Sequence, residues 1–137
     1  MEYLKGLLFI LIAANLILSA YLSYSQLAGT EQFCLTGKGC SIVQKSEYSR
    51  ILGIPISYIG LTSFLALFLF FLLLYNNLLS EKLFLAACYL GTIFAIYFFY
   101  LQAYAIKAYC SNCLATELIM FLITGIATYN YFRIKKN

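Results

Sequence analysis

The sequence predicts an all-α membrane protein, a bundle of four transmembrane helices, and three observations support this fold class. Of the 137 residues, 64% are hydrophobic and only 10% are charged, which lies outside the usual range of soluble domains. The apolar residues gather in stretches that can each cross about 30 Å of hydrocarbon as a helix. These stretches lie at about 4–24, 58–76, 83–106 and 112–132. Polar sequence is almost confined to the loop 26–57, so we expect one domain, 1–137, embedded in the lipid bilayer.

Basic residues set the expected orientation of this bundle. Three of them follow the fourth stretch at once: Arg133, Lys135 and Lys136. Lys5 precedes the first stretch and Lys82 lies in the short turn between the second and third. Because cytoplasmic segments are enriched in Lys and Arg, we expect both termini on the cytoplasmic side of a cell (plasma) membrane. The loop 26–57 then faces the extracytoplasmic side, where disulfides persist.

The net charge of +4 contributes to this orientation but does not suggest a nucleic-acid partner, because the basic residues are scattered and form no stripe. Some basic residues also fall on the opposite side and weaken the bias. They are Lys38, Lys45, Arg50 and Lys107. The orientation therefore depends mainly on the C-terminal cluster.

The loop 26–57 contains a predicted short helix between the first two transmembrane helices. Ser41 and Gln44 fit a capping box, and Gly53 followed by Pro55 gives a stop signal, which together predict a helix at 42–52. Its apolar and charged residues alternate. We expect it to lie in the extracytoplasmic membrane interface as a lid, with a merely connecting surface helix as the alternative.

Four of the five cysteines are candidates for redox chemistry. Cys110 and Cys113 share one face at the start of the fourth helix, close enough for a disulfide, and the helix N-terminus favours a thiolate. Cys34 and Cys40 enclose a short segment with two glycines, which can close into a reactive disulfide ring or a structural staple. Cys88 lies inside the third apolar stretch and is interpreted as a small buried hydrophobe.

The chain has no histidine, which excludes a His–Cys zinc site, haem ligation by His and a Cys–His nucleophilic dyad. A Cys₄ zinc site built from Cys34, Cys40, Cys110 and Cys113, which we call the four outer cysteines, stays open as the structural alternative. Two cysteine pairs on one membrane face suit an electron relay instead, with no metal. One pair would exchange disulfides with a soluble protein, and the other would pass the electrons to a lipid-soluble acceptor.

Candidate ligand residues are expected close to Cys110 and Cys113, which we call the inner cysteine pair. Phe98, Gln102 and Ile106 recur every four residues and are expected to share one helix face. Such a stripe is either packing or one wall of a site for a flat aromatic ligand, with Gln102 donating to a carbonyl. Glu117 lies one turn beyond Cys113 on the same face. A carboxylate in a membrane segment is costly, so it either pairs with Lys107 or takes part in ligand binding or proton transfer.

Taken together, these motifs resemble the vitamin K epoxide reductase family in its stand-alone prokaryotic form. The matching positions, in chain order, are Cys34 and Cys40, Ser46, Gly53-Ile54-Pro55 leading into Ser57 and Gly60, and Cys110-x-x-Cys113 with Thr116 behind it. The bacterial disulfide oxidase that serves the periplasmic thiol oxidase also has four helices and two pairs. Its Cys-x-x-Cys comes first in the chain, so it fits less well.

The resemblance implies a membrane quinone-dependent thiol oxidoreductase that oxidises a thioredoxin-like partner for extracytoplasmic disulfide formation. Cys34 would face the partner, Cys40 would hand the exchange to Cys110, and Cys113 would sit against the quinone. The quinone would be of the ubiquinone, menaquinone or vitamin K type. Since the chain ends at Asn137 without a thioredoxin-like domain, we expect the thiol oxidase to be a separate protein.

We expect the quinone site to be formed by one set of residues. These are Ser46, Phe64, Phe98, Gln102, Ile106 and Glu117. Where the animal enzymes carry an asparagine before the second helix and a tyrosine after the Cys-x-x-Cys, this chain has Ile56 and Glu117. That difference favours a respiratory quinone. The alternatives are a vitamin K quinone or epoxide reductase and, outside enzymes, a membrane protein whose cysteines are staples or bind zinc.

Overall fold

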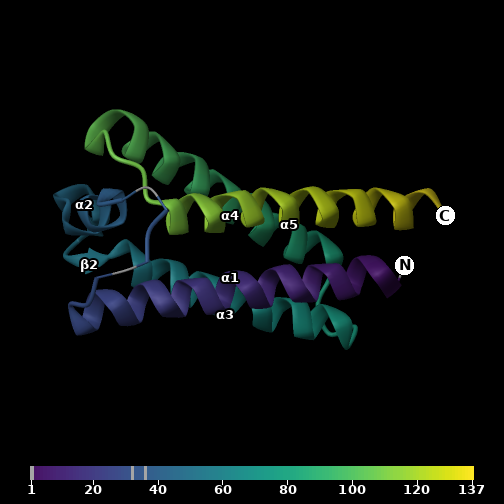
Figure 1. The fold of residues 1–137 in the computed structure, drawn as a ribbon. Coiled ribbons are helices and arrows are strands. Elements are labelled where there is room, and N and C mark those ends of the chain that lie inside the picture. Colours follow the sequence, from purple (N-terminus) through teal and green to yellow (C-terminus); the bar gives the residue numbers. More distant parts are fainter. Residues whose placement is uncertain (1, 32, 36) are drawn as a thin grey trace.

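Four long helices form the body of the molecule in the computed structural model, which describes residues 2–31, 33–35 and 37–137 (Figure 1). They are α1 (Glu2–Ala28), α3 (Ile56–Tyr75), α4 (Glu81–Tyr100) and α5 (Ser111–Lys136). A π-helical segment, η2 (Leu101–Ile106), extends α4. Each of the four spans is long and apolar enough to cross a membrane, α4 together with η2. The chain is therefore a multi-pass membrane protein, and the predicted fold class is confirmed.

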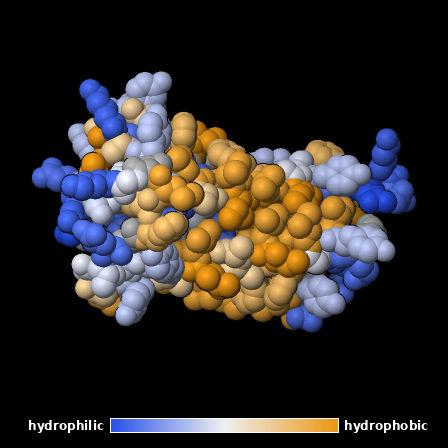
Figure 2. Space-filling model, viewed as in Figure 1, coloured by the Kyte–Doolittle hydropathy of each residue, from blue (hydrophilic) through white to orange (hydrophobic). Residues whose placement is uncertain are grey.

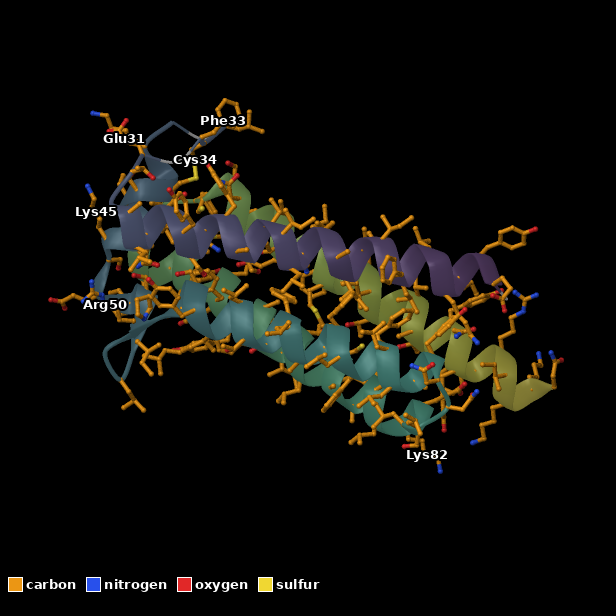
Figure 3. All side chains as sticks on the ribbon, turned by 90° about the horizontal axis from the view of Figure 1, so that it is seen from below. Glu31, Phe33, Cys34, Lys45, Arg50 and Lys82 are labelled. Atoms are coloured by element: carbon orange, nitrogen blue, oxygen red, sulfur yellow. A yellow bond between two sulfur atoms is a disulfide. The ribbon has the colours of Figure 1, made fainter. Side chains whose placement is uncertain are left out.

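The surface shows why these helices belong in lipid. A broad apolar belt covers the middle of the molecule, and hydrophilic residues gather at its two ends (Figure 2). Both termini lie at one end, while α2 and the cysteine-bearing loop lie at the other (Figure 1). Lys82 is at the terminal end, whereas Cys34, Lys45 and Arg50 are at the opposite one, which we call the cysteine end (Figure 3).

The bundle core lies between α1, α3, α4 and α5, with α1 packed against α3 and α5, and α4 against α5. Ile12, Cys88 and Ile123 are completely buried in it. Cys88 thus occupies the position of a small hydrophobe, as expected from the sequence. At the cysteine end, α3 is tied to α1, because Ser57 Oγ donates to Gln26 Oε1 and Ser23 Oγ donates to the Ser57 carbonyl over 3.0 Å.

The connection from α1 to α3 differs from the single helix predicted at 42–52. It consists of α2 (Gly39–Lys45), the 3₁₀ turn η1 (Glu47–Ser49), and a hairpin of β1 (Arg50–Ile51) and β2 (Ile54–Pro55). The Ser41–Gln44 capping box is wrong, since α2 begins three residues before the predicted start at 42, at Gly39, and its N-cap residue, Lys38, makes no side-chain capping bond.

Local side-chain bonds explain why this helix stops early. Ser46 leaves the helical conformation with ψ of 145°, and its Oγ accepts from the Tyr48 amide, which starts η1. Ser49 Oγ donates to the carbonyls of Gln44 and Ser46. Such serine bonds compete with helix continuation. Leu52 and Gly53 both have positive φ, 54° and 82°, as a two-residue hairpin turn requires.

Candidate functional site

The loop cysteines are joined to each other. Cys34 and Cys40 form a disulfide with a Cα–Cα distance of 6.0 Å. Cys40 is buried at the first turn of α2, whereas Cys34 is partly exposed in the preceding loop, where its sequence neighbours Phe33 and Leu35 have exposed side chains. Figure 3 shows Cys34 and Phe33 at this end of the molecule. A disulfide offers no thiolate to zinc. Within the described segments, no group of three or more potential ligands could hold a metal ion.

The inner cysteines are free thiols at the start of α5. Cys110 is the N-cap residue of α5, where its Sγ accepts from the Cys113 amide over 3.4 Å. Both are buried, with 0% and 6% of their surface exposed. They pack with Cys40 in one buried cluster, the cysteine cluster, whose members are Leu22, Cys40, Val43, Cys110 and Cys113. Cys34 packs against its edge, so the structure brings all four outer cysteines together.

Cys110 is the sulfur of the inner pair with the stronger tendency to ionise. A hydrogen bond with the Cys113 thiol and bonds with the backbone amides of Cys113 and Asn112 lower the pKa of Cys110, and burial opposes them only in part. These amides lie at the free N-terminus of α5, where the helix dipole also favours negative charge. Cys110 is therefore suited to exchange with the neighbouring disulfide in its thiolate form.

Two residues that the sequence interpretation left without a role hold the loop against α5. Asn112 Nδ2 donates to the Phe33 carbonyl over 2.9 Å, and the Leu35 amide donates to Ser111 Oγ over 3.1 Å. Ser111 Oγ also lies 3.5 Å from Cys34 Sγ and 3.7 Å from Cys40 Sγ. In the sequence, the only indication of a role for Ser111 and Asn112 is their position between the two cysteines of the Cys-x-x-Cys motif.

A cavity of about 730 Å³ lies inside the bundle, below α2. This volume falls within the range of about 300–1,000 Å³ in which proteins hold small organic ligands. Its wall is mainly apolar and comes from all four long helices. Residues that line it include Leu22, Phe64, Phe98, Cys113, Glu117 and Met120. Among them, Phe64, Phe98, Cys113 and Glu117 were expected from the sequence to surround one ligand.

Gln102 lies at a different place from the one expected. Its side chain is completely buried and does not line the cavity. Its Nε2 donates to Glu117 Oε1 over 2.7 Å, and its Oε1 accepts from the Cys110 amide over 3.0 Å. Gln102 therefore connects the inner cysteine pair with the cavity carboxyl, and both ends of its amide are engaged within the protein.

Phe98 and Ile106 both pack against the cysteine cluster, but Phe98, Gln102 and Ile106 do not form one wall of the bundle cavity, and η2, which contains the latter two, is π-helical. The wider turn changes the direction in which successive side chains point. Phe98 faces the cavity, while Ile106 lines a separate, more open groove of about 630 Å³ at the cysteine end, together with Ser46. Ser46 caps η1 and thus fixes the end of α2, the part of the structure that corresponds to the expected lid helix. Ser46 does not line the bundle cavity.

Glu117 is bound by Gln102 and not by Lys107, which was the alternative partner from the sequence. Lys107 is exposed and has the left-handed conformation that ends η2. Only 6% of the Glu117 surface is exposed, and its Oε2 has no hydrogen-bond partner among the described residues. Since buried polar atoms are nearly always hydrogen-bonded, this oxygen at the cavity wall is available to a ligand.

Fold and site together define a membrane-embedded thiol–disulfide oxidoreductase: two adjacent cysteine pairs lie at one end of a four-helix bundle, and one of them borders a cavity. The chain belongs to the vitamin K epoxide reductase family, whose model matches residues 6–128. The matched range includes the four outer cysteines and every candidate ligand residue. Membership in this family links the thiol chemistry to a quinone.

Proposed function

We propose that this protein oxidises a thioredoxin-like partner outside the cytoplasm and transfers the electrons to a membrane quinone. One observation carries the proposal: the inner pair has two sides. Cys110 is buried against the loop cysteine Cys40, while Cys113 lines the bundle cavity. An electron pair that enters at the loop disulfide can thus leave at the cavity without any large movement of the helices.

The proposed relay consists of three exchanges. The partner's dithiol reduces the Cys34–Cys40 disulfide and is itself oxidised. The Cys40 thiolate then attacks Cys110 Sγ of an inner disulfide, which releases Cys113. Cys34 next attacks Cys40 Sγ, which releases Cys110 and restores the loop disulfide. In the last exchange, Cys110 and Cys113 give two electrons and two protons to the quinone and form their disulfide again. The observed loop disulfide with inner thiols corresponds to the stage before this last exchange.

The cavity residues receive complementary roles in this proposal. Phe64 and Phe98 supply flat apolar surface for the quinone ring, as aromatic side chains do in ligand sites. In its protonated form, Glu117 donates a hydrogen bond from Oε2 to a carbonyl oxygen of the ring or delivers this proton to it. Gln102 holds Glu117 in place, and Ser46 supports the lid by capping η1. Ile106 closes the cysteine cluster from the side of the open groove.

Steady-state kinetics with purified protein test this function. A reduced thioredoxin serves as the electron donor, and soluble ubiquinone, menaquinone and vitamin K analogues serve as acceptors, with vitamin K epoxide alongside. We expect quinol formation that depends on both substrates, and the acceptor series identifies the quinone class. Reduction of the epoxide but of none of the quinones would favour the epoxide reductase alternative.

Substitutions of Glu117 are expected to separate hydrogen bonding from titration. Glu117→Gln keeps a donor at the cavity, so the KM for quinone should change little while the pH profile of kcat changes. Glu117→Leu leaves Gln102 and the ligand carbonyl without a partner, so binding should weaken by about 1 kcal/mol or more, roughly fivefold or more in KM. Unchanged kinetics in both variants would remove Glu117 from the quinone site.

The proposed orientation places the cysteine end outside the cytoplasm and both termini inside. After reduction, an impermeant maleimide added to intact cells or right-side-out vesicles should therefore label Cys34, the partly exposed one of the four outer cysteines, and should reach the three buried ones more slowly, when the loop opens. Cys88, which is completely buried in the bundle core, should stay unlabelled and serves as the internal control. Labelling of Cys110 from the cytoplasmic side alone would contradict both the orientation and the extracytoplasmic function.

A further inference from the structure

The Ser111 hydroxyl lies beside the loop disulfide rather than in solvent. Its Oγ is 3.5 Å from Cys34 Sγ and 3.7 Å from Cys40 Sγ. Sulfur atoms in a disulfide carry no hydrogen, so in both contacts the hydroxyl is the donor. One O–H group thus faces both atoms of the bond that the partner protein has to break.

The hydrogen bond that Ser111 Oγ accepts from the Leu35 amide fixes the direction of the Ser111 hydroxyl. The Leu35 amide donates to Ser111 Oγ over 3.1 Å, which occupies one lone pair and leaves the hydrogen directed to the sulfurs. Ser111 is also the first residue of α5, so its backbone is held by the helix. The neighbouring bond from Asn112 to the Phe33 carbonyl holds the loop over the hydroxyl.

We propose that Ser111 is a catalytic residue of the first exchange, in which its hydroxyl stabilises the sulfur that leaves when the loop disulfide is cleaved. The inference deepens the proposed function and rests on it for the identity of the attacking thiol. It assigns chemistry to a residue between the two inner cysteines, and this chemistry occurs at the other cysteine pair.

The step balances in atoms and electrons. A thiolate of the partner attacks Cys34 Sγ, a bond forms between these two sulfurs, and the Cys34–Cys40 bond breaks with its electron pair going to Cys40 Sγ. The hydrogen bond from Ser111 then changes from a neutral contact to a charge-assisted one, which is shorter and about twice as strong. When the partner's second thiolate attacks the mixed disulfide, Cys34 Sγ leaves with the electron pair, within reach of the same hydroxyl.

Single-turnover exchange with reduced thioredoxin measures this step directly. The chain has no tryptophan, so a change in tryptophan fluorescence reports on the thioredoxin alone. In the absence of quinone, we expect Ser111→Ala to slow the exchange about tenfold, equivalent to about 1.4 kcal/mol of transition-state stabilisation. Ser111→Thr retains the hydroxyl and should stay within about twofold of the wild-type rate.

Asn112→Ala is the matched control, because it removes the adjacent bond to the loop but no contact with sulfur. We expect a clearly smaller loss of exchange rate than in Ser111→Ala, because one bond between the loop and α5 is lost while the hydroxyl keeps its contacts with both sulfurs. An equal loss in Asn112→Ala and Ser111→Ala would show that Ser111 only positions the loop. A wild-type rate in Ser111→Ala would likewise overturn the proposal.

A second readout does not need a partner protein. In the fully reduced protein, Ser111→Ala should raise the thiol pKa of the more acidic of Cys34 and Cys40. This pKa is obtained from the pH dependence of alkylation by iodoacetamide, which is followed by mass spectrometry of the loop peptide. Ser111→Thr should leave it unchanged. An identical alkylation profile in Ser111→Ala would refute the role of Ser111. Failure of wild-type exchange with thioredoxin, together with the expected alkylation shift, would count against the proposed partner class alone.

Discussion

Replacing Cys113 by Ser is expected to reduce quinone reduction to the uncatalysed rate with every electron donor. Of the four outer cysteines, Cys113 is the one that lines the bundle cavity. A hydroxyl at this position is neither a nucleophile toward the ring nor able to form a disulfide with Cys110, so the electron pair cannot leave the inner pair. Quinol formation is followed by absorbance, with dithiothreitol and reduced thioredoxin as alternative donors.

Cys88→Ala is the control for this experiment, since it removes a buried thiol that belongs to the bundle core and not to the site. It should keep its quinone reduction rate and lose only some thermal stability, as expected for a small core truncation. If Cys113→Ser retained an appreciable part of the wild-type rate, the inner pair would not be the donor to quinone. The two-sided inner pair, on which the proposed function depends, would then be abandoned.

The fold could be predicted because the bilayer imposes a simple rule on the sequence. Four long apolar stretches have few other solutions than transmembrane helices, since every backbone polar group in lipid has to be satisfied within its own segment. The four outer cysteines could be selected as candidates from the sequence, because Cys-x-x-Cys at a helix start and a glycine-containing ring have recognisable spacings. Their packing into one cluster agrees with the expected relay.

The local errors have local causes. Predicted helix 42–52 ignored the bonds that Ser46 and Ser49 make to the backbone, which divide the segment into α2, η1 and a hairpin. The face shared by Phe98 and Gln102 assumed a regular α-helix, and the π-helical η2 invalidates that assumption. A single wide turn changes which side chains face the cavity, and hydrophobic periodicity does not reveal it.

The contacts of the candidate site that join distant segments could not be predicted. Ser111 meets Cys34 across 77 positions of sequence, and Asn112 meets Phe33 across 79. The pairing of Glu117 with Gln102 likewise depends on how α5 packs against η2. Spacing within one helix indicated that Glu117 lies below Cys113 but did not identify its partner. These contacts come from the tertiary packing that the docked loop creates.

Replacing Cys34 by Ser should affect the two electron donors differently. Cys34 is the partly exposed member of the loop disulfide, beside the exposed apolar side chains of Phe33 and Leu35, and is therefore the sulfur that a protein partner reaches first. Without it, oxidation of thioredoxin should fall by about a hundredfold or more, because no loop disulfide can form. Dithiothreitol is small enough to attack the Cys110–Cys113 disulfide directly, so its rate should stay within about fivefold of the wild-type rate.

The comparison is made with the same enzyme preparation, the same quinone and the two donors in parallel. Cys40→Ser provides the matched variant, since it removes the same disulfide from its buried side and should show the same loss with thioredoxin. The ratio of the two rates is the informative quantity, because loss of folding would lower both together. An equal loss with both donors in a folded Cys34→Ser variant would mean that every electron passes through the loop disulfide, and the direct route to Cys110 would be excluded.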